Sequence, residues 1–365
     1  KRQDLDLGEA DVLRRGMSGK FRSRAEFKRV EQKFIVNCRQ KGFSDALIKK
    51  VWDQISSFAG YAFAKGHSAS YAVESYQSLF LKCYYPLEFM TAVLNNGGGF
   101  YSTEHYLHEA KMQGATICLP CINNSDHPNR LIGTSIYLGF GYLRQLEQFT
   151  IQRLLTERQL HGSYLSLDDF IDRVVISIEQ LTILIRIDAF RFTKQRKTEL
   201  MWKAIFKLNA NGLKTQQSKL FKIQHKEYKL PKLDSNWVED AYDEMELLGF
   251  PLCNYFELVS EEMQGGILAS EMKNYINKNI LIYGSLVTTR FNKTYKGKLM
   301  RLSTFIDQRG DYFDAVHFTD VVDKYPINGL GVYACFGNIT DRFDFYSMSV
   351  VWSKKLPIVK DPRNN

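Results

Sequence analysis

The sequence predicts an α+β fold of several domains, in which two helical regions precede a small C-terminal β-barrel. At 365 residues the chain is longer than one compact domain usually is. Apolar residues recur at helical spacing through the first hundred residues and again over 142–208. The last ninety residues instead alternate with the two-residue period of strands, so the helices come first and the barrel last.

Four helices are expected in the first hundred residues. Ser44 suits the N-cap of the second helix, and a glycine-bounded loop over 60–67 precedes the third. Pro86 suits the first turn of the fourth helix, which the glycine-rich run 95–99 stops.

The middle of the chain predicts short strands followed by helices. Two or three strands are expected over 116–140, and Ser166 with Asp169 forms a capping-box pattern at the start of one later helix. Residues 209–240 are polar and irregular and are interpreted as a linker, which leads into a short helix around 237–248.

Five strands with one short helix between the third and fourth are predicted at the C-terminal end. The helix covers 319–325. The strands are expected at 279–290, 297–306, 312–318, 331–340 and 344–352. This is the layout of an OB barrel, and a generic small β-barrel is the alternative.

Composition narrows the class of protein. No apolar run approaches the ~20 residues that cross a membrane, and the N-terminus has no signal-peptide pattern. Six scattered cysteines favour a reducing cytoplasm over a disulfide framework. The net charge is +9, and the segment 14–50 holds twelve Lys/Arg against three acids, which favours a polyanionic partner.

Two N-terminal segments carry a family resemblance. The first is Glu9-Ala-Asp-Val-Leu-Arg-Arg15, followed by Met17 and Lys20. The second is Phe58-Ala-Gly-Tyr-Ala-Phe-Ala-Lys-Gly-His-Ser-Ala-Ser-Tyr-Ala72, continuing to Tyr85-Pro-Leu-Glu-Phe-Met90. In order and spacing they closely resemble the fingers region of bacterial DNA polymerase III alpha subunits, the C-family DNA polymerases. The error-prone paralogue of that family is included in the resemblance.

The resemblance implies a domain order. The expected domains are helical fingers (1–115), a clamp-binding region with a degenerate tandem helix-hairpin-helix (116–208), a linker with a clamp-binding motif and a short helix (209–273), and an OB-fold domain (274–365). Such a chain would be the C-terminal part of a polymerase, from the fingers onward. It would bind deoxynucleoside triphosphate, primer-template and single-stranded DNA, and sliding clamp, with no membrane partner.

Nucleotide-binding residues are implied by the same motifs. Guanidinium groups match phosphate oxygens with paired hydrogen bonds, so Arg14 and Arg15 are expected to face the nucleotide or the template backbone, with Lys20 contacting DNA. The family also places Tyr61, Lys65 and His67 near the incoming nucleotide. A solvated basic helix face and an ordinary loop histidine are the alternative interpretations.

The two expected hairpins lack glycine. They are Leu143-Arg-Gln-Leu-Glu147 and Ile185-Arg-Ile-Asp-Ala189. Without glycine a hairpin cannot easily adopt positive φ or bring its amides close to phosphate. We therefore expect the fold to persist and phosphate binding to weaken, with Arg144 and Arg186 partly compensating.

The linker holds a five-residue pattern that resembles a clamp-docking motif. In Gln217-Ser-Lys-Leu220-Phe221 the glutamine would make paired hydrogen bonds, and Leu220 and Phe221 would fill an apolar pocket. The alternative is a Leu-Phe pair that packs back on the neighbouring domain.

The first hairpin of the barrel is basic. Its cations are Arg290, Lys293, Lys296, Lys298 and Arg301. Phe291, Tyr295 and Phe305 lie nearby, and a basic surface with aromatic rings suits single-stranded DNA. The alternative is that the rings belong to the core and the lysines only keep the hairpin tip soluble.

No catalytic or metal-binding residue is expected in this chain. Mg²⁺ belongs to the full-length polymerase, whose palm aspartates the resemblance places upstream. Asp168, Asp169 and Asp172 are interpreted as helix-terminal charge and capping, and the thiols near His127 as structural. The chain alone is expected to be inactive. A noncatalytic single-stranded-DNA-binding or clamp-adaptor protein is the alternative function, and a structural protein with an unrelated barrel is a third.

Overall fold

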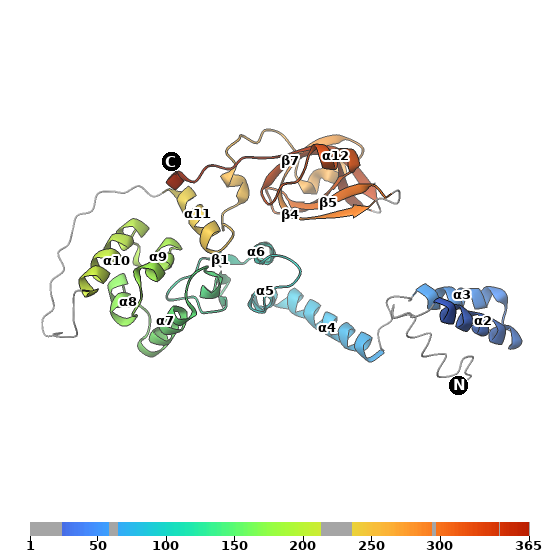
Figure 1. The fold of residues 1–365 in the computed structure, drawn as a ribbon, viewed down its shortest axis with the longest axis horizontal. Coiled ribbons are helices and arrows are strands. Elements are labelled where there is room, and N and C mark those ends of the chain that lie inside the picture. Colours follow the sequence, from blue (N-terminus) through green and yellow to red (C-terminus); the bar gives the residue numbers. More distant parts are fainter. Residues whose placement is uncertain (1–23, 58–64, 213–235, 294–296, 343, 365) are drawn as a thin grey trace. The chain divides into compact units, whose positions relative to one another are not determined.

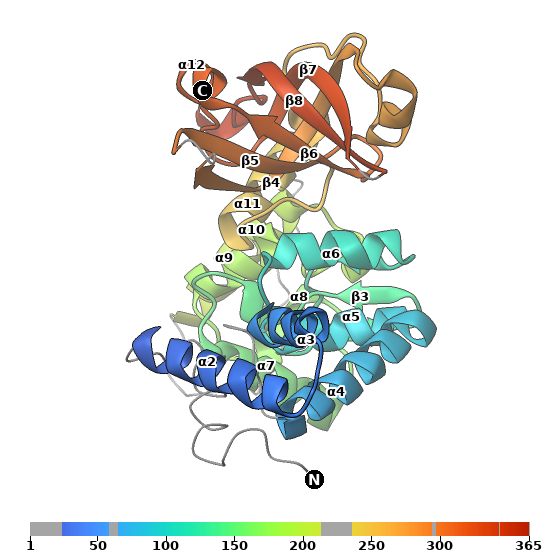
Figure 2. The same cartoon turned by 90° about the vertical axis from the view of Figure 1, so that its right-hand side faces the viewer.

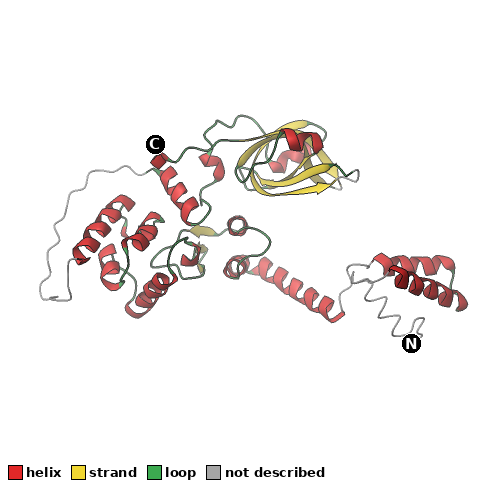
Figure 3. Ribbon diagram, viewed as in Figure 1, coloured by secondary structure: helices red, strands yellow, loops and turns green. Residues whose placement is uncertain are grey.

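A computed structural model describes residues 24–57, 65–212, 236–293, 297–342 and 344–364. The chain divides into two compact units, 1–84 and 85–365 (Figure 1). Among the described residues, no helix combines the length and the apolar character that crossing a membrane requires. The predicted α+β class is confirmed, since helical regions precede a closed five-stranded barrel (Figure 3).

The described part of the first unit opens with a helical hairpin. Helix α2 (Arg24–Gln40) and helix α3 (Asp45–Ser57) pack through buried apolar side chains, and the rings of Phe34 and Trp52 lie 5.4 Å apart. The predicted cap at Ser44 is confirmed, because its hydroxyl accepts the N–H of Leu47 at 3.4 Å.

Helix α4 (Lys65–Tyr84) corrects the predicted loop over 60–67. Lys65, Gly66 and His67 form the first turn of this helix instead. Amides of a first turn have no intrahelical acceptor in any case, so a glycine there costs less than one in a helix interior. Residues 66–84 are exposed along their whole length.

The second unit opens with two helices and a small sheet. Helix α5 (Pro86–Asn95) has Pro86 in its first turn and is followed by glycines with positive φ, as predicted. Helix α6 (Thr103–Met112) leads into strands β1 (Thr116–Cys118), β2 (Arg130–Ile132) and β3 (Ser135–Tyr137). The central strand β3 pairs parallel with β1 and antiparallel with β2.

A second helical region follows and contains the largest core. Its helices are α7 (Gln148–His161), α8 (Leu167–Arg173), α9 (Ile178–Arg186) and α10 (Lys197–Gly212). The rings of Phe140, Phe170 and Phe190 are fully buried among them. Short 3-10 turns at Phe140–Tyr142 and Arg191–Thr193 precede α7 and α10.

The predicted cap of α8 is confirmed with one difference. The Ser166 hydroxyl accepts the N–H of Asp169 at 3.1 Å. The Asp169 carboxylate reaches the N–H of Leu165 at 2.9 Å, one residue before the N-cap, rather than the N–H of Ser166 itself. Both contacts still satisfy amides at the helix entrance.

Helix α11 (Trp237–Leu247) and the 3-10 turns Tyr255–Leu258 and Ala269–Tyr275 lead into the barrel (Figure 2). Its strands are β4 (Asn279–Lys293), β5 (Leu299–Ile306), β6 (Tyr312–His317), β7 (Val332–Arg342) and β8 (Phe345–Lys355), with α12 (Thr319–Lys324) between β6 and β7. The last described segment is a 3-10 turn, Pro362–Asn364.

The barrel has the order β4-β5-β6-β8-β7, and β4 also pairs with β7 to close it. Only β6 and β8 run parallel among these neighbours. This order, with a helix after the third strand, confirms the predicted OB-type barrel. A Cβ on Gly284 would lie 2.7 Å from Phe305 and Phe313, whose stacked rings are 5.3 Å apart. Only glycine therefore fits at this position of β4.

Candidate nucleic-acid interface

The first hairpin, between the 3-10 turn at Phe140–Tyr142 and α7, turns through Gln145 at φ 66°. A buried side chain from α9 supports this turn. The Gln180 side-chain oxygen accepts the N–H of Glu147 at 2.7 Å, and its amide nitrogen donates to the Gln145 carbonyl at 2.9 Å. Gln180 therefore binds the backbone on both sides of the turn.

The second hairpin follows α9 and turns through Asp188 at φ 58°. The N–H of Ala189 donates to the Leu184 carbonyl, and the Ala189 carbonyl accepts the N–H of Ile122 at 3.0 Å. Burial raises the pKa of the Asp188 carboxyl, while Lys197 and Arg191 oppose that shift.

Both hairpins correct the expectation that they could not easily adopt positive φ. A left-handed residue other than glycine costs roughly 1–2 kcal/mol, and aspartate tolerates this region better than most. Gln180 compensates at the first hairpin by satisfying two backbone groups. The expectation that the helical hairpin fold persists is confirmed.

Most amides of the first hairpin already have acceptors within the chain. The N–H groups of Arg144, Leu146 and Glu147 donate to Leu247, Leu143 and Gln180 respectively. The N–H groups of Ile187 and Asp188 in the second hairpin donate to carbonyls of α9. Phosphate would have to compete with these internal bonds, which is consistent with weakened binding through hairpin amides.

The structure gives Arg186 a partner that the sequence did not indicate. Its guanidinium contacts Asp243 at 2.6 Å and also pairs with Glu246, so it joins α9 to α11. Arg363 contacts the same Asp243 at 2.7 Å. Arg186 is thus paired with acids of the same chain, whereas Arg144 is exposed and its guanidinium lies close to Gly249.

The basic hairpin of the barrel projects as a two-stranded ribbon. Residues 288–293 of β4 are all exposed, whereas residues 280–287 alternate between buried and half-buried. Arg290 and Lys293 fall on opposite faces of the ribbon because strand side chains alternate. Lys298 is exposed at the start of the returning strand.

The rings of this region divide between surface and core. Phe291 is 55% exposed, and the Arg301 guanidinium lies over its ring at 4.3 Å. Arg301 also donates to the Ile327 carbonyl at 2.9 Å. Phe305 is fully buried in the barrel, so one of the predicted rings is available to a ligand and another is structural.

Several predicted site residues lie outside the described residues. They are Arg14, Arg15, Lys20, Tyr61, Gln217, Leu220, Phe221, Tyr295 and Lys296. Lys65 begins α4, but its side chain is outside the description, and His67 is exposed in the same turn. Their roles remain predictions.

The acidic cluster of α8 is engaged in ion pairs. Asp168 and Asp172 contact the largely buried Lys207 ammonium at 3.1 and 3.0 Å, and Asp169 contacts Arg173. Asp168 and Asp169 lie in the first turn of α8, as the interpretation as N-terminal charge and capping expects, but for Asp172 it was wrong, because this residue lies in the last turn and pairs with Lys207. Within the described residues no group of three or more His, Cys, Asp or Glu side chains is placed to hold a metal ion.

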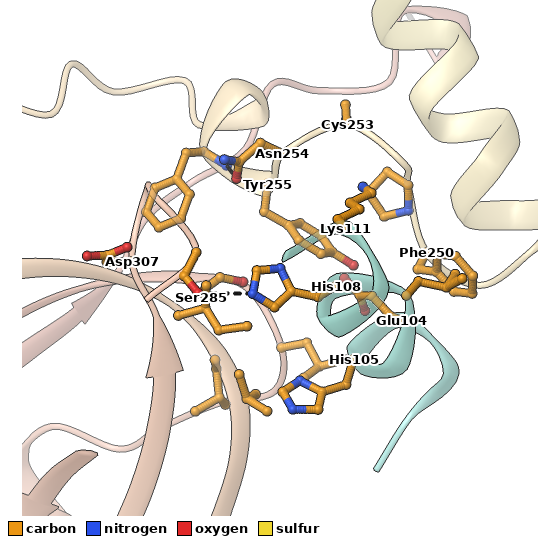
Figure 4. Close-up of a pocket in the computed structure, with 18 of the residues that line it drawn as sticks. Glu104, His105, His108, Lys111, Phe250, Cys253, Asn254, Tyr255, Ser285 and Asp307 are labelled. Atoms are coloured by element: carbon orange, nitrogen blue, oxygen red, sulfur yellow. Dashed lines mark hydrogen bonds between the residues drawn. The ribbon is translucent and has the colours of Figure 1, made fainter. Parts of the chain in front are cut away.

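The sequence did not predict a cavity of about 420 Å³ where α6, the segment 250–256 and the barrel meet (Figure 4). Helix α6 contributes Glu104, His108 and Lys111. The His108 Nε2 lies 3.0 Å from the Gly310 carbonyl, and Lys111 donates to the Leu252 carbonyl at 2.9 Å. These contacts tie α6 to the turn between β5 and β6 and to the segment after α11.

Burial changes the ionisation of this cavity. It raises the pKa of Glu104 to about 7, against a hydrogen bond from Tyr255 and the charge of Lys111. It lowers the pKa of Lys111 and, with Glu244 and Glu257 nearby, raises the pKa of Cys253 to about 11. Two side chains at this cavity, the Glu104 carboxyl and the Cys253 thiol, therefore hold their protons to higher pH than they would in water.

Comparison with known proteins identifies relatives. A family model described as "Helix-hairpin-helix motif" matches residues 114–200. The chain is 27% identical to a DNA polymerase III subunit alpha of Aquifex aeolicus over 87% of this chain and 27% of that protein. It is 36% identical to the same subunit of Staphylococcus aureus strain Mu50 (54% and 19%) and 31% identical to an error-prone DNA polymerase of Vibrio campbellii (55% and 20%).

These matches cover 54–87% of this chain but only 19–27% of the relatives' own length. The helix-hairpin-helix match falls on the segment with the two hairpins described above. The chain is therefore a relative of the bacterial DNA polymerase III alpha subunits and error-prone DNA polymerases, and it spans about a fifth to a quarter of them.

Proposed function

We propose that the chain is part of a DNA polymerase alpha subunit and that it binds incoming nucleotide, primer-template DNA and sliding clamp during template-directed DNA synthesis. The observation that carries this proposal is the match to a DNA polymerase III subunit alpha along 87% of the chain. The full-length protein would be the DNA-directed DNA polymerase.

The described residues support binding rather than chemistry. Polymerases hold Mg²⁺ with clustered carboxylates. The acids of α8 do not fit this role, because their carboxylates already pair with Lys207 and Arg173. We propose that this chain orients substrates for palm carboxylates, which the resemblance places in another part of the polymerase.

The projecting ribbon of the barrel is the proposed contact for single-stranded DNA. Its exposed cations can neutralise phosphates, and exposed Phe291 offers a ring for a base. Arg301 lies over the Phe291 ring and bonds the Ile327 carbonyl, so it would orient that ring rather than bind phosphate freely.

Salt-dependent binding tests this contact. Fluorescence anisotropy of labelled oligothymidylate should show that replacing Arg290, Lys293 and Lys298 with Ala weakens binding. The slope of log K against log salt should fall by roughly 0.7 for each phosphate that the variant no longer neutralises. A control variant with Lys273, Lys324 and Lys360 replaced by Ala removes the same charge elsewhere. Equal weakening in both variants would reject a role specific to the ribbon.

Two further experiments test the partners. Replacing Leu220 and Phe221 with Ala should abolish retention of the chain by immobilised sliding clamp, and unchanged retention would reject the motif.

In the full-length polymerase, Arg15→Ala or His67→Ala should raise the apparent KM for nucleotide or lower kcat. Normal kinetics in both variants would remove these residues from the nucleotide site.

A further inference from the structure

A second cavity, of about 430 Å³, lies between α6 and the outer face of the barrel. Its barrel residues come from β4 at the base of the proposed DNA ribbon, from the end of β5 away from the ribbon tip, and from β6 and β8, and the ribbon cations Arg290, Lys293 and Lys298 are not among them. Thr288, Thr304 and Asp314 are cross-strand partners in one row over β4, β5 and β6. This row forms the wall opposite α6.

Aromatic rings dominate the remaining walls. Tyr101, Tyr312, Phe345 and Tyr346 line the cavity, and the first three are 42–57% exposed. The His105 ring lies 4.7 Å from the Tyr101 ring and 5.3 Å from the Tyr312 ring, and its Nε2 is 3.1 Å from the Tyr312 hydroxyl. These contacts fix the orientation of two tyrosines at the cavity edge.

The charge of the lining is negative. Glu109 and Asp314 are the acids, and none of the described residues that line the cavity is a lysine or arginine. Burial, and to a smaller extent the charge of the neighbouring His108, lowers the pKa of His105, so that ring is neutral at neutral pH. Burial and the nearby Glu109 raise the pKa of Tyr312 to about 12. A phosphate group would meet repulsion here, so the chemistry differs from that of the basic ribbon.

Aromatic faces attract cations through the ring quadrupole, and a nearby carboxylate adds direct attraction. We propose that this cavity binds an organic cation, an ammonium or guanidinium group that lies against Tyr312 and Phe345 and faces Asp314 and Glu109. The same head group is carried by small amines and by the side chains of a protein ligand. The two carboxylates disfavour the phosphates of a nucleic-acid strand.

Titration calorimetry with matched probes tests the site in the 365-residue chain. Choline should bind more tightly than 3,3-dimethyl-1-butanol, its neutral isostere, and an acetylated Gly-Arg-Gly amide should compete with choline if a protein side chain is the ligand. Tighter binding of choline than of the peptide would indicate a small amine. Equal affinity for choline and the neutral isostere would overturn the proposal.

Variants at the surface of the cavity locate the binding. Phe345→Ala should weaken choline binding about two- to fivefold, as expected for one exposed cation–π contact, and Phe345→Leu should weaken it similarly because apolar size alone does not replace the ring. Asp314→Asn should also weaken choline binding, although the asparagine side-chain oxygen can still accept the Thr304 hydroxyl. Phe318→Ala and Asp320→Asn change an exposed ring and an exposed acid outside the cavity. Equal weakening in these controls would place choline elsewhere.

Discussion

The side chain of Gln180 on α9 holds the left-handed turn at Gln145, donating to the Gln145 carbonyl at 2.9 Å while accepting the N–H of Glu147. Gln180 is only 8% exposed, so water cannot easily replace it in either contact. One glutamine thus lets a hairpin without glycine keep the geometry of the helix-hairpin-helix fold.

Replacing Gln180 with Leu should lower the free energy of unfolding by about 2–3 kcal/mol, because it leaves two part-buried backbone groups without their partner. Urea denaturation followed by circular dichroism measures the change. Gln152→Leu on the exposed side of α7 is the matched control and should change stability by less than about 0.5 kcal/mol. Equal effects of the two substitutions would show that Gln180 does not support the turn.

Gln145→Gly tests the strain in the same hairpin. Glycine removes the cost of the left-handed conformation but adds chain entropy, so the net stabilisation should be zero to about 1 kcal/mol. Gln152→Gly in the interior of α7 should instead destabilise by about 1 kcal/mol. Thermal unfolding of both variants compares them. Destabilisation by Gln145→Gly would mean that its side chain contributes more than its backbone costs.

Arg186 is predicted to act on stability rather than on DNA affinity. Asp243 keeps its contact with Arg363 when Arg186 is replaced, so Arg186→Ala should destabilise the second unit by about 1–2 kcal/mol through the lost charge-assisted hydrogen bonds. The salt slope of oligonucleotide binding should stay at its wild-type value. A reduced slope at unchanged stability would return Arg186 to the phosphate contacts.

How far the sequence predicted these features depended on the range of the interactions. Strand alternation and the turn residues sufficed for the barrel, and Ser166 and Pro86 marked their helices, because those signals are local. The absence of glycine misled at Gln145, since the compensating Gln180 lies 35 residues away from the turn it supports. At Asp188 it misled because aspartate tolerates the left-handed region better than most residues. The cavity around Glu104 joins segments near 104, 255 and 307, and no local pattern brings those together.

The Glu104 carboxyl should make stability fall as pH rises. Its folded pKa of about 7 exceeds the ordinary 4.5, so its contribution is fully present below pH 4.5 and is lost by about pH 7. The loss should be on the order of 3 kcal/mol at most. Glu104→Gln should therefore make stability rise more steeply with pH than in the wild type, in denaturant unfolding measured from pH 4.5 to 7, whereas the exposed control Glu262→Gln should keep the wild-type curve. An unchanged slope in Glu104→Gln would assign the proton to another group.

His317 should act with the opposite sign in an overlapping window. Burial, and then the charge of Arg301, lower its pKa from 6.5 to about 4, so the barrel keeps this contribution above pH 6.5 and loses it as pH falls towards 4. Between pH 4.5 and 6.5 the Glu104 contribution opposes that of His317 in the wild type. Glu104→Gln should then expose the His317 slope, with stability falling on acidification. A double variant adds His317→Gln, whose amide can still reach the Ser353 hydroxyl. In it, the fall in stability on acidification should disappear. If the fall persists, His317 is not its source.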